Sequence, residues 1–297
     1  MLVLRPLFVL LVVLCAAAPV QAQERLKVVA TFSILADFVR QVGGERVEVV
    51  TLVGPDGDAH VYSPNPADAR QLAGARLVVA NGLGFDGWIV RLAKASGSRA
   101  AMVEAAQGVK PLALKGSHRH GHGADPHAWQ NVANAKLYVA AIRDALVKAD
   151  PDSRAAYEAN ETAYAAKLDG LDEELRQAVQ KIPPERRKAI TSHDAFAHFE
   201  AAYGVDFVAP QGVSTEAEAS AKDVARIIQQ IRRDKIPAVF IETISDPRLI
   251  ERIAKETGAR IGERLYSDAL SAQGGPAGTY IDMMRHNIRA LGAALSS

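Results

Sequence analysis

The chain has 297 residues, with 35 lysines and arginines against 34 aspartates and glutamates, and so a formal net charge of +1. This near-neutral balance, with no basic stripe along the chain, argues against nucleic acid or an anionic membrane surface as a partner. The length exceeds the usual size of one domain, so we expect two lobes that share a cleft.

Residues 1–22 have the three-part pattern of a secretory signal peptide. Arg5 precedes the apolar run LFVLLVVLC, and small residues lead to a predicted cleavage after Ala22. The apolar run is shorter than the about 20 residues of a membrane span, and no later segment comes close to one. Removing 22 of the 297 residues leaves 275, with 34 basic and 34 acidic residues once Arg5 is gone. We therefore expect a mature, monomeric protein of the periplasm.

The only cysteine, Cys15, lies inside the predicted signal peptide. The mature chain would then have neither a disulfide nor a thiolate metal ligand. In the alternative interpretation Cys15 carries a lipid anchor, but the bulky Leu14 stands where lipoprotein signals have a small residue.

Residues 23–150 alternate short β-branched runs with helical patterns, which predicts an N-terminal α/β lobe with a parallel sheet. Its predicted strands are 27–33, 47–53, 75–81 and 101–106. The same alternation returns in residues 184–297, a predicted C-terminal α/β lobe with strands at 188–192, 206–210, 238–243 and 260–267.

Residues 151–183 form a predicted linker helix between the lobes. We expect Asp152 as its N-cap and Pro183 with Pro184 as its end. Apolar side chains recur at helical spacing along one face; they are Tyr157, Tyr164, Leu168, Leu171, Leu175, Ala178 and Ile182. About 31 residues would span roughly 46 Å, enough to run along both lobes as a rigid link. The alternative is a core helix interrupted at Gly170, where glycine costs about 1 kcal/mol relative to alanine.

A further helix is predicted after the Ser220 to Asp223 capping box, with Val224, Ile227, Ile228 and Ile231 on its apolar face.

Four metal-capable side chains stand at strand ends or helix starts. His60 follows a strand in a turn rich in Gly, Pro and Asp, and His127 directly precedes a helix. His193 ends a strand, and Asp268 stands between a strand and a glycine-rich turn. Ligand sites in open α/β sheets gather beyond the carboxyl ends of the strands. We therefore expect these four side chains, two from each lobe, to meet in the cleft.

Three imidazoles and one carboxylate form a complete tetrahedral set for Zn²⁺. A catalytic zinc keeps an open position where it activates water. A closed set of four protein ligands holds the ion without such activation. If Asp268 bound through both oxygens, the coordination number would rise to five and Mn²⁺ would become the alternative. Intrinsic affinity still favours Zn²⁺ over Mn²⁺.

At these positions the chain resembles the zinc and manganese solute-binding proteins of ABC transporters, known as cluster A-I. The resemblance covers essentially all of the mature sequence and rests on an ordered set of motifs, which are DAHVYSPNPAD, NGLGFDGW, DPHAWQNVANA, SHDAFAHFEAAYGV, GVSTEAEASAKDVARII, FIETISDPRLIERIAKETG and LYSDALS with GPAGTYIDMMRHN.

The resemblance implies two α/β lobes joined by a rigid helix and one metal ion bound between them. It also implies delivery of that ion to a membrane permease. By motif position the ligands are His60, His127, His193 and Asp268. Manganese-type relatives tend to carry glutamate in place of His193, which favours zinc here.

A histidine tract precedes the second ligand, and His118, His120 and His122 alternate there with Arg119 and glycines. This composition favours a flexible loop. Zinc-type relatives often have a histidine-rich insertion here, so we expect a low-affinity loop that hands Zn²⁺ to the cleft or receives it from a metallochaperone. The alternative is a solvated loop without a role.

Glu242 ends a strand that faces the same cleft, which makes it a candidate acceptor for the N–H of a metal-bound imidazole. Trp129 either closes over the ion or simply packs. We expect His198 to be structural, and Arg285 and His286 to lie on the surface.

A secreted zinc hydrolase is the main alternative from another functional class. The chain has no His-Glu-x-x-His pair and no Gly-x-Ser-x-Gly turn, so it carries neither signature. A siderophore or haem binding protein would need arginines or aromatic side chains around an organic ligand, and the four loops present metal ligands instead.

Overall fold

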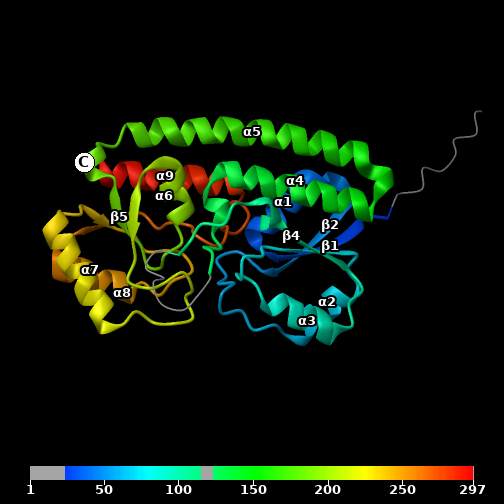
Figure 1. Ribbon diagram of the computed structural model, residues 1–297, viewed down its shortest axis with the longest axis horizontal. Coiled ribbons are helices and arrows are strands. Elements are labelled where there is room, and N and C mark those ends of the chain that lie inside the picture. Colours follow the sequence, from blue (N-terminus) through cyan, green and yellow to red (C-terminus); the bar gives the residue numbers. More distant parts are fainter. Residues whose placement is uncertain (1–23, 115–122, 297) are drawn as a thin grey trace, which may run out of the picture.

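The computed structural model describes residues 24–114 and 123–296. Within these ranges the chain forms two sheets of four strands, in the orders β2-β1-β3-β4 and β6-β5-β7-β8. Every registered pair of strands is parallel. The predicted fold class, two parallel-sheet α/β lobes joined by one long helix, is confirmed (Figure 1).

The first sheet and its helices come from the first half of the chain. Its central strands are buried on both faces, and accordingly they read as continuous apolar runs. The elements are β1 (Leu26–Phe32), α1 (Ser33–Gly43), β2 (Val47–Val53), α2 (Pro66–Ala73), β3 (Leu77–Ala80), α3 (Trp88–Ser96), β4 (Ala101–Glu104) and α4 (Val132–Ala149).

The second sheet has shorter strands. Its elements are β5 (Lys188–Ile190), α6 (Ala197–Tyr203), β6 (Asp206–Val208), α7 (Ala221–Asp234), β7 (Ala238–Val239), α8 (Arg248–Thr257), β8 (Arg260–Ile261) and α9 (Tyr280–Leu295). The predicted strands 238–243 and 260–267 are therefore much reduced, and only an isolated bridge between Glu242 and Leu265 extends their pairing. Helix α7 begins as predicted, because the Ser220 side chain accepts a hydrogen bond from the Asp223 N–H.

Helix α5 (Arg154–Gln180) runs along the lobes as one uninterrupted helix of 27 residues (Figure 1). Gly170 lies within it on the exposed side and does not interrupt it. The prediction of Asp152 as N-cap is wrong. Pro151 starts a 3₁₀ turn that includes Asp152, so the cap position falls to Ser153, whose side chain makes no capping hydrogen bond.

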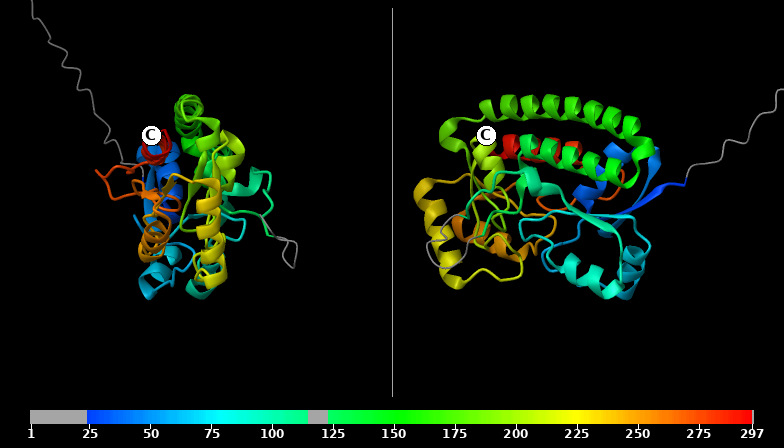
Figure 2. Two further views of the ribbon diagram at one scale, coloured as in Figure 1. Left: turned by 90° about the vertical axis from the view of Figure 1, so that its left-hand side faces the viewer. Right: turned by 45° about the vertical axis from the view of Figure 1, so that its right-hand side comes forward.

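The largest hydrophobic cluster runs through both lobes. It joins the first sheet and α1 to α5 and α9, and continues into the second sheet through Phe207 and Phe240. A separate cluster, built around Ile227, Ile250 and Ile253, holds α7 and α8 against the second sheet through Ile190 of β5 and Val239 of β7. Helices α4, α5 and α9 lie on one side of the molecule, whereas α2 and α3 in one lobe and α7 and α8 in the other lie opposite (Figures 1 and 2).

Among the described residues, no helix combines the length and apolar character that crossing a membrane requires. The predicted signal peptide at 1–22, with its predicted cleavage after Ala22, lies outside the described residues. The lobe boundaries at residues 150 and 183 stay predictions.

Candidate metal centre

His60 lies on the loop between β2 and α2, and both polar atoms of the peptide group before it are hydrogen-bonded. Asp58 Oδ1 accepts a hydrogen bond from the His60 N–H at 2.9 Å, and Trp88 Nε1 donates to the carbonyl of Ala59 at 3.0 Å. The His60 side chain is 5% exposed, so its ring points inward from the loop.

His127 stands just before the 3₁₀ turn that leads into α4, and its side chain is fully buried. One oxygen of Asp125 lies 2.8 Å from the His127 backbone nitrogen and 2.9 Å from its Nδ1. Because a carboxylate only accepts hydrogen bonds, Nδ1 carries a proton and Nε2 of the neutral ring is left as the metal-binding atom.

Asp125 is a functional residue that the sequence motifs did not identify. The available signal was an aspartate two residues before a histidine, which recurs as Asp58 before His60.

His193 follows β5 and is held by Glu242. Glu242 Oε1 accepts hydrogen bonds from the backbone N–H groups of Ser192 and His193, at 2.8 and 2.9 Å. Its Oε2 lies 2.7 Å from His193 Nδ1, and both side chains are fully buried. Oε1 therefore fixes the backbone of the loop, whereas Oε2 and Nδ1 are close but not aligned as a hydrogen bond.

Asp268 follows the Leu265 bridge and not a regular strand. The carbonyl of the preceding Ser267 accepts hydrogen bonds from Trp129 Nε1 at 2.8 Å and Gln130 Nε2 at 2.7 Å. These bonds come from the other lobe, so both lobes position the Asp268 carboxylate.

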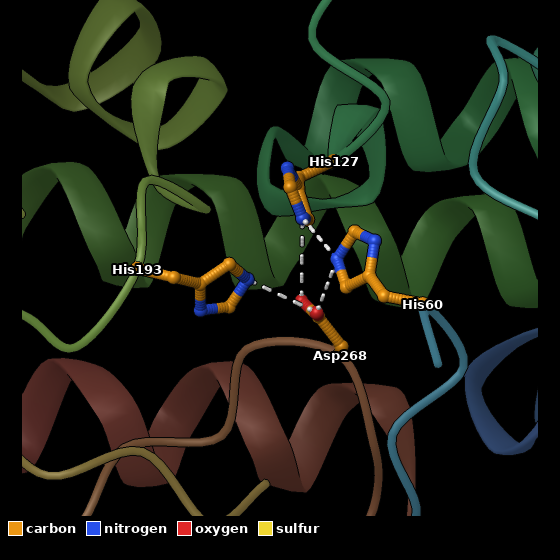
Figure 3. A group of neighbouring side chains, drawn as sticks. All are labelled: His60, His127, His193 and Asp268. Carbon is orange, nitrogen blue, oxygen red and sulfur yellow. Dashed lines mark hydrogen bonds and ion pairs between the residues drawn. The ribbon is translucent and has the colours of Figure 1, made fainter. Parts of the chain in front are cut away.

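The four side chains converge on one point from four segments of the chain (Figure 3). His60 Nε2 lies 3.2 Å from His127 Nε2 and 3.1 Å from Asp268 Oδ2. His193 Nε2 lies 3.2 Å from Asp268 Oδ2, and His127 Nε2 lies 3.7 Å from Asp268 Oδ1. Ligand atoms around a tetrahedral ion with bonds of about 2.0–2.2 Å are roughly 3.3–3.6 Å apart. The four quoted distances are close to those of a tetrahedral set, and one ligand atom from each residue lies within 4.8 Å of all the others.

Electrostatics in this cluster favour charged groups despite burial. Burial alone would lower the pKa of His127, but the carboxylates of Asp268 and Asp125 outweigh it and raise that pKa to about 9. Burial likewise opposes the charge on His193, yet Glu242 and Asp268 raise its pKa well above the usual value. For Asp268 burial raises the pKa, and the neighbouring His193 and His127 more than reverse this and lower it well below the usual value.

The other singled-out residues lie outside the cluster. His198 is buried, with Nδ1 3.2 Å from Asn134 Nδ2 and Nε2 3.3 Å from the Asp125 carbonyl. Trp129 is fully buried, and its ring packs against those of His127 and Phe32.

The surface prediction for His286 is wrong. His286 is buried, with Nε2 2.8 Å from the Arg264 carbonyl, because α9 is covered on most of its circumference. Arg285 is on the surface and pairs with Glu174. The predicted loop histidines His118, His120 and His122 lie outside the described residues.

Comparison with known proteins gives matches along nearly the whole chain. The model of the family described as zinc-uptake complex component A, periplasmic, matches residues 28–294. The manganese-binding lipoprotein MntA of Halalkalibacterium halodurans is 35% identical over 297 residues, covering 97% of each chain. The iron-binding protein YfeA of Yersinia pestis is 33% identical over 270 residues, covering 91% of this chain and 86% of that protein.

Among solved structures, the periplasmic zinc binding protein TroA from Treponema pallidum superposes with a TM-score of 0.87 at 32% sequence identity. The match covers 92% of this chain and 100% of that one. The names of these three similar proteins refer to three different metals.

Proposed function

This chain belongs to the family of zinc-uptake complex component A, periplasmic, and from that premise we propose that it binds one Zn²⁺ ion and delivers it for import. Its relatives are substrate-binding proteins of metal ABC transporters and not enzymes. This chain is likewise a substrate-binding protein of a metal ABC transporter. The proposed ligands are His60, His127, His193 and Asp268.

The observation that carries this proposal is a set of buried polar atoms that lack hydrogen-bond partners. Both oxygens of Asp268 and the Nε2 of His193 are buried, and no aligned donor or acceptor meets them in the described part of the chain. Buried polar groups are nearly always satisfied, and exceptions of this kind indicate a missing ion or water. A divalent cation at the centre of the four groups would satisfy all of them.

Zinc is preferred because of the donor set. Three imidazole nitrogens and one carboxylate oxygen match Zn²⁺, whereas Mn²⁺ prefers oxygen ligands. First-row affinities also rise from Mn²⁺ and Fe²⁺ towards Zn²⁺ at a site of this kind. The relatives named for manganese and iron make those two ions the alternatives.

In this proposal Asp125 and Glu242 set the tautomers of two ligands. Each carboxylate faces an Nδ1 atom, so that Nε2 of the same ring is available to the ion. Binding then releases the protons that the metal-free imidazoles hold, because only neutral imidazole binds a metal. The four proposed ligands would fill all four positions of a tetrahedral ion. A hydrolase, which needs an open position for water, is therefore disfavoured.

The remaining parts of the proposal concern location and partners. We expect export by the signal peptide, cleavage after Ala22 and action as a monomer in the periplasm. The partner is the permease of an ABC transporter, and a metallochaperone is a second candidate partner through His118, His120 and His122. The mass of the exported protein would test the cleavage, since a lipid anchor on Cys15 would give a different mass.

The experiment that tests the function is native mass spectrometry of the untagged mature protein after exposure to equal zinc and manganese. We expect wild type to retain one zinc ion, and His193→Ala to lose or weaken it. His286→Ala is the matched control, because that histidine is buried outside the cluster. Retention of manganese in preference to zinc, or unchanged zinc in His193→Ala, would reject the proposal.

A further inference from the structure

We propose that the hydrogen bond between Thr215 and Asp58 is a latch across the cleft that sets how fast the metal ion enters and leaves. This inference rests on the proposed function. Thr215 Oγ1 donates to Asp58 Oδ2 at 2.6 Å, and the two residues are 157 positions apart in the chain. Asp58 belongs to the loop after β2 and Thr215 to the loop between β6 and α7, so the bond joins the two lobes.

On the side of the first lobe, the bond leads directly to a proposed ligand. The other oxygen of Asp58 accepts from the backbone N–H of His60. Ala59, between them, is buried, and its carbonyl accepts from Trp88. Asp58 is therefore a rigid connector between Thr215 and the His60 loop.

On the other side, the Thr215 loop is bonded to the segment that carries His193. The backbone N–H of Gln211 donates to the Ser192 carbonyl at 3.3 Å, and that of Asp194 donates to the Gly212 carbonyl at 3.1 Å. These contacts flank His193 on both sides. The latch thus links the loops of two ligands from opposite lobes, and its opening would let His60 and His193 separate.

The two sides of the cleft are held together differently. On the side of α4 and α9, buried hydrogen bonds cross between the lobes, among them Trp129 to Ser267 at 2.8 Å and Leu270 to Ser33 at 2.9 Å. The Thr215–Asp58 bond is only part-buried. A cavity of about 470 Å³, lined by Asp58, Ser192 and Thr215 among others, lies against it. Solvent can therefore compete for this bond, which makes its side of the cleft the easier one to open.

Helix α7, which follows the Thr215 loop, supports this assignment. It packs in the smaller hydrophobic cluster with α8, separate from the core that runs through both lobes. The loop can move with α7 and α8, whose apolar side chains are not part of the shared core, while that core stays intact. The backbone N–H of Asp56 also donates to the Leu270 carbonyl at 2.9 Å, a bond across the cleft that does not involve the Thr215 hydroxyl.

The test uses Thr215→Val in the mature full-length protein, since valine keeps the shape of threonine without the donor. The zinc-loaded protein is mixed with a fluorescent chelator, and release is followed by stopped flow. Loss of a hydrogen bond to a charged group should speed release on the order of tenfold. A latch must open for entry as well as exit, so uptake should also be faster, and the equilibrium affinity should change less than the release rate.

Two further variants make the result decisive. Thr215→Ser keeps the hydroxyl and should restore slow release. Thr162→Val removes an exposed hydroxyl that bonds only to the Glu158 carbonyl in α5, and should release zinc as wild type does. Circular dichroism checks that each variant is folded.

Release from Thr215→Val at the wild-type rate would overturn the latch, as would equally fast release from Thr215→Ser. A loss of affinity as large as the gain in release rate, with uptake unchanged, would also overturn it, because that pattern describes a structural bond. If wild type itself binds no zinc, the proposed function fails, which is a different result from failure of the latch.

Discussion

Glu242 is the residue that contacts both the backbone and the ring of His193. One of its oxygens fixes the backbone of Ser192 and His193, and the other faces His193 Nδ1. In Glu242→Gln the amide oxygen can keep the two backbone bonds, but the amide nitrogen would meet the Nδ1 proton, donor against donor. We expect zinc affinity to fall about 10- to 100-fold, measured by competition with a chelator.

Glu48→Gln is the control for this prediction, because it removes the same charge from an exposed position of β2. Unchanged zinc affinity in Glu242→Gln would mean that Glu242 only holds the backbone of Ser192 and His193 and does not orient the imidazole.

Protons compete with the metal ion at His127, and the structure sets the pH range of this competition. With its pKa raised to about 9, His127 is protonated at neutral pH in the absence of metal. Zinc affinity should therefore rise up to about tenfold per pH unit for each displaced proton as the pH approaches about 9. An ordinary imidazole would level off near its usual value of about 6.5.

Stability of the metal-free protein should follow the opposite trend. Because the folded-state pKa of His127 lies above its unfolded value, its contribution is complete below about pH 6.5 and is lost as the pH rises through about 9. The rise in melting temperature on zinc addition should consequently grow between pH 6.5 and 9, with His286→Gln behaving as wild type. A zinc effect that is constant over this range would contradict the assignment.

His60 and His193 could be predicted from the sequence because each follows a parallel strand, and such strands bring their carboxyl ends to one edge of the sheet. His127 precedes a 3₁₀ turn and Asp268 follows an isolated bridge, so their motif positions indicated them more directly than strand ends did. Asp125 could not be found in that way, since its role depends on one oxygen reaching both the backbone and the ring of His127. The expectation that His286 lies on the surface is wrong, and its position next to Arg285 in the sequence gives no sign of its burial. Its burial depends on Tyr266 and the Arg264 carbonyl, which come from another part of the chain.

At the scale of elements, α5 could be predicted because its apolar residues recur at helical spacing and lie on the one face that packs against the protein. Tyr157, Tyr164, Leu168, Leu171 and Leu175 are all buried in the structure. The N-terminal boundary was less predictable. A 3₁₀ turn begins there at Pro151. Whether Asp152 or Ser153 takes the cap position depends on the backbone geometry of this turn, which the spacing of apolar residues does not predict.

Strands β7 and β8 are shorter than the apolar runs in their sequence predict. The run AVFIET reads as six strand residues, but regular pairing ends at Val239. A side chain at Gly262 would meet the Phe240 ring, since a Cβ there would lie 2.3 Å from Phe240 Cε1. Beyond Val239 the pairing with β8 is irregular, and it includes the isolated bridge between Glu242 and Leu265. This irregular stretch carries Glu242 towards the cluster.

At the scale of the whole molecule, the two sheets do not have two separate cores. The main hydrophobic cluster passes from the first sheet through α5 and α9 into the second lobe. Buried bonds such as Tyr280 Oη to the Trp129 carbonyl, at 2.6 Å, reinforce the same region. Wide opening of the lobes would break this core, whereas movement of the Thr215 loop with α7 would not.

We therefore expect metal binding to leave the overall shape nearly unchanged. Small-angle X-ray scattering of the protein with and without zinc should give the same radius of gyration within experimental error, because α5 and the shared core resist rotation of one lobe against the other. His193→Ala with added zinc is the control for effects of the ion outside the cluster. A clear compaction of wild type that this variant does not show would mean that zinc closes the lobes as rigid bodies. In that event the shared core would have to deform far more easily than its continuous packing indicates.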